Sequence, residues 1–183
     1  AYAGWEDDLR ICCEEFGMKG LRLYPKWHNY ELSDPRCVEL VNRATEMGMV
    51  ISIPIRVEDY RQRSWLVDVP DVPLDEIAEL VRRCPEAKFI LVNGIGFVNS
   101  PLGQKGSELP PNYYIEISRL SALLRNEIGQ LIENIGAERI VFGTGIPFKY
   151  PDPSLVKLEV LEISEEEKEM IRWKNAAKLL GIA

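Results

Sequence analysis

Charged side chains follow directly after one of the most apolar segments of the sequence. The run MVISIPI (49–55) is succeeded by RVEDYRQR, which holds three arginines and two carboxylates. An arginine can bind an anionic group through two parallel hydrogen bonds, and a carboxylate can act as a general base. We therefore predict Arg56 as a substrate-binding residue and Glu58 and Asp59 as catalytic residues. A solvated charged loop without a role is the alternative interpretation.

A single histidine, His28, follows a second apolar segment, GLRLYP (20–25), within the sequence KWHNY. A histidine changes its charge near neutral pH, so it can pass protons to and from a substrate. We predict His28 as the proton shuttle, while an exposed histidine without a function is the alternative.

Five short apolar segments, four of them followed by a helical pattern, predict the elements that position these residues. The strand segments are 20–25, 49–55, 89–93, 113–118 and 139–145, and the helical patterns that follow the first, second, fourth and fifth are 35–48, 73–84, 119–135 and 164–181. A further helix is expected at 5–16, and the helix at 119–135 is expected to bury Leu124. Strict alternation of strands and helices predicts an α/β fold with a parallel sheet. An open sheet and part of a barrel both fit this alternation.

Composition excludes several classes of protein. The net charge is -7 and the pI is about 4.9, so nucleic acid and anionic membranes are poor partners. No apolar run reaches 18 residues and no signal peptide is visible, so a cytoplasmic location is expected. The four cysteines form no C-x-x-C motif and fit buried thiols. The glycine cluster GIGFVNSPLG (94–103) lacks the dinucleotide-binding spacing, and no cofactor is predicted.

A resemblance to a known family rests on GMKGLRLYP, MVISIPI, CPEAKFILVNG, YIEIS, ERIVFGTGIP and NAAKLLGI. In this order, these segments resemble the C-terminal portion of the amidohydrolase-related TIM-barrel family, within the metal-dependent hydrolase superfamily. The resemblance implies that the five strands are strands 4 to 8 of a (β/α)8 barrel. Residues 1–183 are then expected to form a single, incomplete barrel domain that lacks strands 1 to 3. The chain begins with Ala, so we expect it to be processed or part of a longer protein. A missing N-terminal segment or a homo-oligomer partner should cover its exposed sheet edges.

The sequence departs from this family at the positions that hold a metal. The resemblance places histidines at the ends of strands 5 and 6 and an aspartate on strand 8, where this chain has Pro54, Asn93 and Gly145. Proline and glycine side chains offer no donor atom, and an amide is a poor zinc ligand. We therefore predict no metal at this site.

Side-chain alternation predicts which strand residues face the barrel interior. If Pro54, Asn93 and Ser118 face inward, alternation adds Ser52, Arg56, Leu91 and Glu116, and the polar positions of the first strand are Arg22 and Tyr24. We predict that a substrate cavity is lined by Arg22, Tyr24, Arg56, Asn93 and Glu116. The loops 26–30 and 56–63 should form its roof. An interior ion pair between Arg22 and Glu116 is the structural alternative.

These features favour a metal-independent hydrolase or lyase-type enzyme that acts on a small anionic molecule. The alternative is a catalytically inactive relative whose scaffold serves binding or assembly. A metal-dependent hydrolase with an unusual site is disfavoured because the family's ligand residues are replaced.

Overall fold

The computed structural model of the protein describes residues 2–61, 63–147 and 149–182. In these ranges five strands form one sheet in the order β1-β2-β3-β4-β5, with every neighbouring pair parallel. Their bounds are β1 Gly20–Arg22, β2 Val50–Pro54, β3 Phe89–Val92, β4 Tyr113–Glu116 and β5 Ile140–Val141. The order and direction confirm the predicted α/β arrangement, although each strand is shorter than the apolar segment that contains it.

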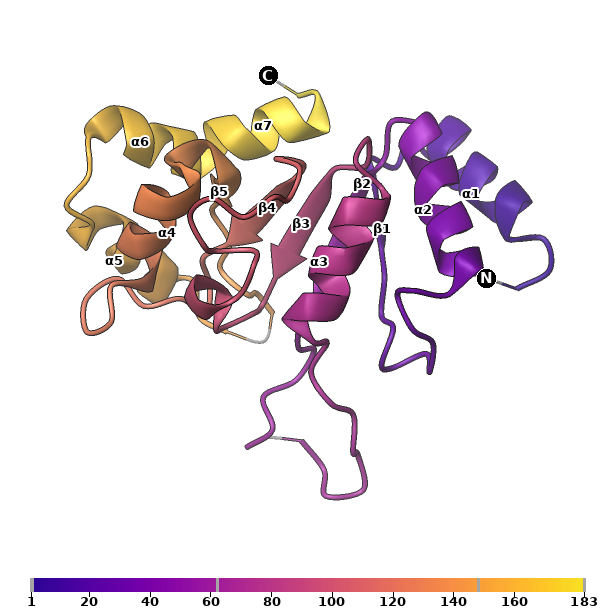
Figure 1. Cartoon of the computed structure of the whole chain (residues 1–183), viewed down its shortest axis with the longest axis horizontal. Helices are drawn as coiled ribbons and strands as arrows, with labels where there is room; N and C mark the ends of the chain where they lie inside the picture. The colour runs from indigo at the N-terminus through magenta and orange to yellow at the C-terminus, as the bar shows by residue number, and fades with distance from the viewer. Residues whose placement is uncertain (1, 62, 148, 183) are drawn as a thin grey trace.

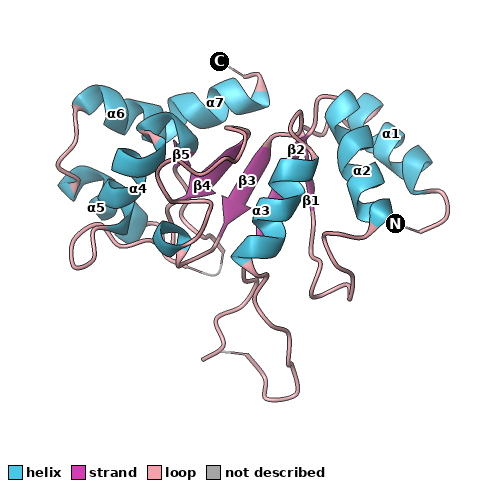
Figure 2. Cartoon of the chain, viewed as in Figure 1, coloured by secondary structure: helices cyan, strands magenta, loops and turns pink. Residues whose placement is uncertain are grey.

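Helices flank the sheet, with α1 and α2 at one end and α4 to α7 at the other (Figures 1 and 2). Their bounds are α1 Trp5–Glu14, α2 Pro35–Glu46, α3 Leu74–Arg83, α4 Glu127–Ile135, α5 Asp152–Val160, α6 Glu165–Glu169 and α7 Asn175–Leu180. Short 3-10 turns cover Phe97–Asn99 and Ala137–Arg139, and a π-helical turn, Met170–Lys174, joins α6 to α7. No helix in the described ranges has both the length and the apolar character needed to cross a membrane.

The two faces of the sheet differ in burial. Ile51, Ile53, Phe89, Leu91 and Ile115 are fully buried and belong to the apolar core. On the opposite parity, Ser52, Ile90 and Val92 line a hollow together with Glu116 and Val141. Leu91 was predicted to face the barrel interior with Asn93, but it lies in the apolar core on the other face of the sheet. Asn93 follows the end of β3 with a left-handed backbone (φ 55°), so alternation cannot be counted back from it into the strand.

The segment 119–135 is helical only in its second half, and Leu124 is fully exposed rather than buried. The Glu127 carboxylate accepts hydrogen bonds from the Ser121 backbone N–H and hydroxyl, both at 2.9 Å. Asn126 then caps α4 by accepting from the Gly129 N–H. These contacts hold residues 119–126 as a loop, because serine and asparagine side chains compete with helical hydrogen bonding.

The C-terminal helices fix the position of β5. The buried Asn175 amide donates 2.8 Å hydrogen bonds to the carbonyl oxygens of Ala137 and Ile140, which bracket the start of this strand. Just beyond its end, the Phe142 N–H donates to the carbonyl oxygen of Ile171 in the π-helical turn. The segment that leaves β5 is therefore anchored on both sides before it reaches the cavity described next.

Candidate functional site

A cavity of about 600 Å³ lies at the carboxyl ends of the strands, and we call it the strand-end cavity. Its walls come from the ends of β1 to β4 and from residues 143–147 and Lys149, which follow β5. The five residues predicted to share one cavity all line it: Arg22, Tyr24, Arg56, Asn93 and Glu116. Their roles in binding a substrate remain predictions.

The three residues predicted as catalytic are not brought together. Asp59 lines the strand-end cavity, whereas Glu58 is exposed and lines a small neighbouring pocket with Lys26 and Trp27. His28 is exposed, with its ring centroid 5.7 Å from that of Tyr24. The loop 26–30 adds no residue to the cavity wall among the described residues, and in the loop 56–63 position 62 lies outside the described ranges.

Glu116 is the buried carboxylate of the site. It accepts hydrogen bonds from the Asn93 N–H at 3.2 Å, from the Ser118 N–H at 2.6 Å and from the Ser118 hydroxyl at 2.8 Å. A Cβ atom on Gly143 would lie 2.2 Å from Glu116 Oε1, so the absent side chain at this glycine makes room for the carboxylate. In the described structure Arg22 forms no ion pair with Glu116, and its Nε donates to Ser52 Oγ at 3.2 Å instead.

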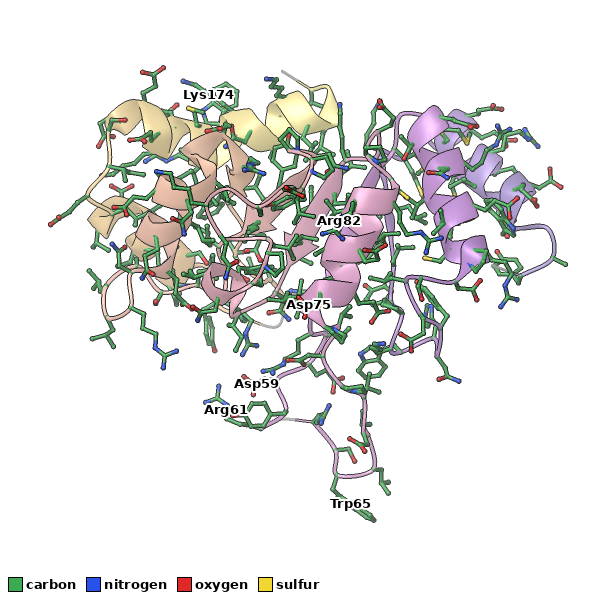
Figure 3. All side chains as sticks on the ribbon, viewed as in Figure 1. Asp59, Arg61, Trp65, Asp75, Arg82 and Lys174 are labelled. Atoms are coloured by element: carbon green, nitrogen blue, oxygen red, sulfur yellow. The ribbon has the colours of Figure 1, made fainter. Side chains whose placement is uncertain are left out.

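Arg56 is already engaged by a carboxylate. Its guanidinium forms a two-pronged ion pair with Asp71, with Nε 2.8 Å from Oδ1, and this pair raises the pKa of Arg56. The backbone carbonyl of Arg56 also accepts from the Asn93 side-chain amide. These contacts fix the start of the loop that follows β2, a segment that projects away from the body of the molecule with Trp65 near its tip (Figure 3).

Asp59 is held by two arginines. Its carboxylate accepts from the Arg61 backbone N–H at 3.0 Å and from the Arg61 side chain at 3.0 and 2.8 Å, and Asp59 and Arg61 lie side by side in Figure 3. Arg119 Nη2 is 3.6 Å from the same carboxylate. Arg61 is the main cause of a pKa of Asp59 held well below its usual range. A carboxylate with such a low pKa is a weak base, which makes Asp59 better suited to positioning the arginines than to proton transfer.

Lys149, like Arg61 and Arg119, lines the strand-end cavity but was not predicted from the sequence as a site residue. Its Nζ lies 3.0 Å from Asn93 Oδ1 and 3.5 Å from Ser118 Oγ. Burial of the amine, followed by the positive charge of Arg119, lowers the pKa of Lys149 to about 8. One feature of the sequence could have indicated Lys149. The family resemblance implies an aspartate where this chain has Gly145, and a glycine there leaves room for a side chain from nearby.

Asn93 links the site's polar groups. It adopts a left-handed backbone conformation, which asparagine tolerates better than most residues. In this conformation its N–H donates to Glu116, its side-chain N–H donates to the Arg56 carbonyl, and its side-chain oxygen accepts from Lys149. Sparsely populated backbone conformations of this kind cluster at functional sites.

One protein family matches nearly the whole chain. The model of the amidohydrolase family matches residues 4–182. The chain belongs to the amidohydrolase family. This confirms the resemblance seen in the segments from GMKGLRLYP to NAAKLLGI.

Similar proteins of this family include decarboxylases. The chain is 22% identical to 2-amino-3-carboxymuconate-6-semialdehyde decarboxylase of Dictyostelium discoideum, over 96% of this chain and 56% of that protein. A solved structure of 2,6-dihydroxybenzoate decarboxylase in complex with 2,6-dihydroxybenzoate aligns with a TM-score of 0.69, 18% identity, and 97% of this chain on 66% of that one. A dihydroxybenzoic acid decarboxylase from Polaromonas sp. JS666, solved with bound manganese and the inhibitor 2-nitroresorcinol, aligns with a TM-score of 0.66, 18% identity, and 97% of this chain on 65% of that one.

The chain thus spans between about half and two thirds of the length of these amidohydrolase relatives. Together with the five parallel strands, the structural match shows a partial TIM barrel. β1 and β5 are the outer strands of the described sheet. That a further segment or a second copy of the chain covers their open edges stays a prediction.

The described residues around the strand-end cavity do not fit a divalent metal. In the described ranges no group of three His, Cys, Asp or Glu side chains could hold one. Both Glu116 oxygens already accept hydrogen bonds, and the Asn93 side-chain oxygen accepts from the Lys149 amine. A divalent cation would have to share these oxygens with a nearby ammonium group, and the charges would repel.

Proposed function

We propose that the protein binds a small anionic acid in the strand-end cavity and releases its carboxyl group as CO2, without a metal ion. The charge of the cavity carries this proposal. In the described structure five cationic side chains line it against two anionic ones, namely Arg22, Arg56, Arg61, Arg119 and Lys149 against Asp59 and Glu116. The chain as a whole carries a net charge of -7, so the excess of cations is local and would concentrate small anions there.

Two of these arginines have donors to spare for a carboxylate. Arg119 shares Asp59 with Arg61, which makes the closer contacts, and the Arg119 side chain is only 15% exposed. Arg22 donates through Nε to Ser52, which leaves its two terminal nitrogens for another group. An arginine can bind a planar carboxylate through two parallel hydrogen bonds. We therefore assign anion binding to Arg119 and Arg22, and give Arg56 the task of holding the loop after β2.

Lyase chemistry is favoured over hydrolysis because the named relatives are decarboxylases. In such a reaction the bond between the substrate carbon and its carboxylate breaks and CO2 leaves. The electron pair stays on the carbon until a proton replaces the lost group. A cation fixed near that carbon stabilises the developing charge. The strand-end cavity offers such cations among its own side chains.

The test is CO2 release by the full-length protein from two small acids, 2,6-dihydroxybenzoate and acetoacetate, with binding of each acid measured by calorimetry. The wild type should bind at least one of them and release CO2 from it. Arg119→Gln should weaken binding by about 10-fold or more, because an ionic hydrogen bond is worth about 1.5–3 kcal/mol. Arg125→Gln is the matched control, because Arg125 is exposed and does not line the strand-end cavity.

Binding that depends on Arg119 without any release of CO2 would support the second candidate, an inactive relative that serves as a binding protein. Binding that is unchanged in Arg119→Gln would contradict the assignment of the strand-end cavity altogether.

A further inference from the structure

The side chain of Lys149 is held in one direction by its surroundings. The Lys149 N–H donates to the Gly145 carbonyl at 3.1 Å, which brings Lys149 close to Gly145. A Cβ atom on Gly145 would lie 2.8 Å from Lys149 Cδ, so the aliphatic stem lies directly over this glycine. Gly145 has a φ of 78°, a conformation that favours glycine. This hydrogen bond and the absence of a side chain on Gly145 together direct the Lys149 amine into the strand-end cavity.

Two hydrogen-bond acceptors also orient the Lys149 amine. Asn93 Oδ1 and Ser118 Oγ, at 3.0 and 3.5 Å from Nζ, can accept its two hydrogens when the amine is neutral. The lone pair then remains for an electrophile in the strand-end cavity. Burial of the amine, helped by the positive charges of Arg119 and Lys157 nearby, lowers the pKa of Lys149 to about 8. About a tenth of the amine is therefore neutral at pH 7, which is far more than for an exposed lysine.

We infer that Lys149 forms an imine with the carbonyl group of a small 3-oxo acid, so that the lysine takes the place of a metal as the electron sink. This inference rests on the proposed function and names its substrate class. A lysine that is desolvated or lies next to another cation is a recurrent nucleophile toward carbonyl compounds. A 3-oxo acid is required because only one bond separates its carbonyl carbon from the bond that holds the carboxylate. An imine formed at that carbon can therefore accept the electron pair of the bond that breaks.

Each step of this reaction balances. The amine adds to the carbonyl carbon and water leaves, which gives a protonated imine. The bond to the carboxylate breaks, CO2 departs, and its electron pair moves to the imine nitrogen to give an enamine. A proton adds to the carbon that lost CO2, and water hydrolyses the imine to release the ketone and the free amine. Overall one 3-oxo carboxylate and one proton become one ketone and one CO2.

The experiment traps the imine in the full-length protein with sodium borohydride during incubation with acetoacetate. Peptide mass mapping should then show an isopropyl group on Lys149, the product expected when trapping follows loss of CO2. Lys157 is an internal control, because it is also half-buried with a lowered pKa but donates to the Ile117 and Ser118 carbonyls and does not line the cavity. It should stay unmodified.

A second variant separates imine chemistry from simple charge. Lys149→Arg keeps a cation but cannot form an imine, so it should still bind acetoacetate and should lose both the adduct and CO2 release. The inference is overturned if no adduct forms on Lys149, if Lys157 is modified instead, or if Lys149→Arg still releases CO2. Release of CO2 from 2,6-dihydroxybenzoate without any adduct would overturn it too, while leaving the proposed function standing.

Discussion

Replacement of Glu116 tests how much the hydrogen bonds of its buried carboxylate stabilise the fold around the strand-end cavity. Its carboxylate is buried and accepts three hydrogen bonds, two from backbone N–H groups and one from a hydroxyl. Glu116→Ala leaves the Asn93 and Ser118 N–H groups without their acceptor. Each unsatisfied buried donor costs about 1–3 kcal/mol, while the Ser118 hydroxyl can rotate toward another acceptor. We expect Glu116→Ala to lower the free energy of unfolding by about 2–6 kcal/mol.

Glu116→Gln is the matched control, because glutamine keeps the shape and one oxygen that can accept from the Ser118 N–H. Its loss should be roughly half that of the alanine variant or less. Urea unfolding of the full-length protein, followed by circular dichroism, measures both values. A loss below about 0.5 kcal/mol for Glu116→Ala, the range of ordinary surface substitutions, would refute this reasoning, as would equal losses for the two variants.

Three further predictions concern the Asn175 hydrogen bonds that anchor β5, the loop before α4 and the Lys149 amine. Asn175→Ala removes two hydrogen bonds from a buried amide and should lower the free energy of unfolding in urea by about 2–4 kcal/mol. A loss under about 1 kcal/mol would contradict the role of Asn175 in anchoring β5. Leu124→Ser should change stability by less than about 0.5 kcal/mol because Leu124 is exposed, whereas Leu131→Ala, in the buried stripe of α4, should cost about 2–5 kcal/mol; similar losses would contradict the boundary of α4. Lys149 has a pKa of about 8 in the folded protein against 10.5 when unfolded, so its burial penalty is fully present below pH 8 and disappears as the pH rises to 10.5. Arg119 and Lys157 deepen the penalty and Glu116 and Asp59 reduce it. The stability of the wild type relative to Lys149→Met should therefore rise between pH 8 and 10.5, and a flat difference would contradict the assignment.

Local patterns were sufficient to predict the strands and most helices. The apolar runs around Ile51 and Phe89 became buried parallel strands, and the helices predicted to begin at 35 and 164 begin at Pro35 and Glu165. Leu124 was misplaced because its spacing fits a helix, while the loop is fixed by contacts of Glu127 and Asn126 that spacing does not show.

The composition of the cavity was only partly accessible from the sequence. Alternation along regular strands placed Arg22 and Glu116 in the cavity, but it failed for Leu91, where counting began from a left-handed residue. Lys149 was missed because it reaches the cavity over Gly145, not from a strand. The binding role first given to Arg56 could not take account of Asp71, fifteen residues along the chain, which forms its ion pair.

We propose that this amidohydrolase chain uses its own cations in place of a metal. The most direct measurement is CO2 release from acetoacetate by the full-length protein after exhaustive treatment with a chelator, with residual metal determined by elemental analysis. We expect the rate to be unchanged when less than about one metal ion per ten protein molecules remains, well below the full occupancy that a metal-bound catalyst needs. A rate that falls in proportion to the metal removed, and returns with added manganese, would contradict the account.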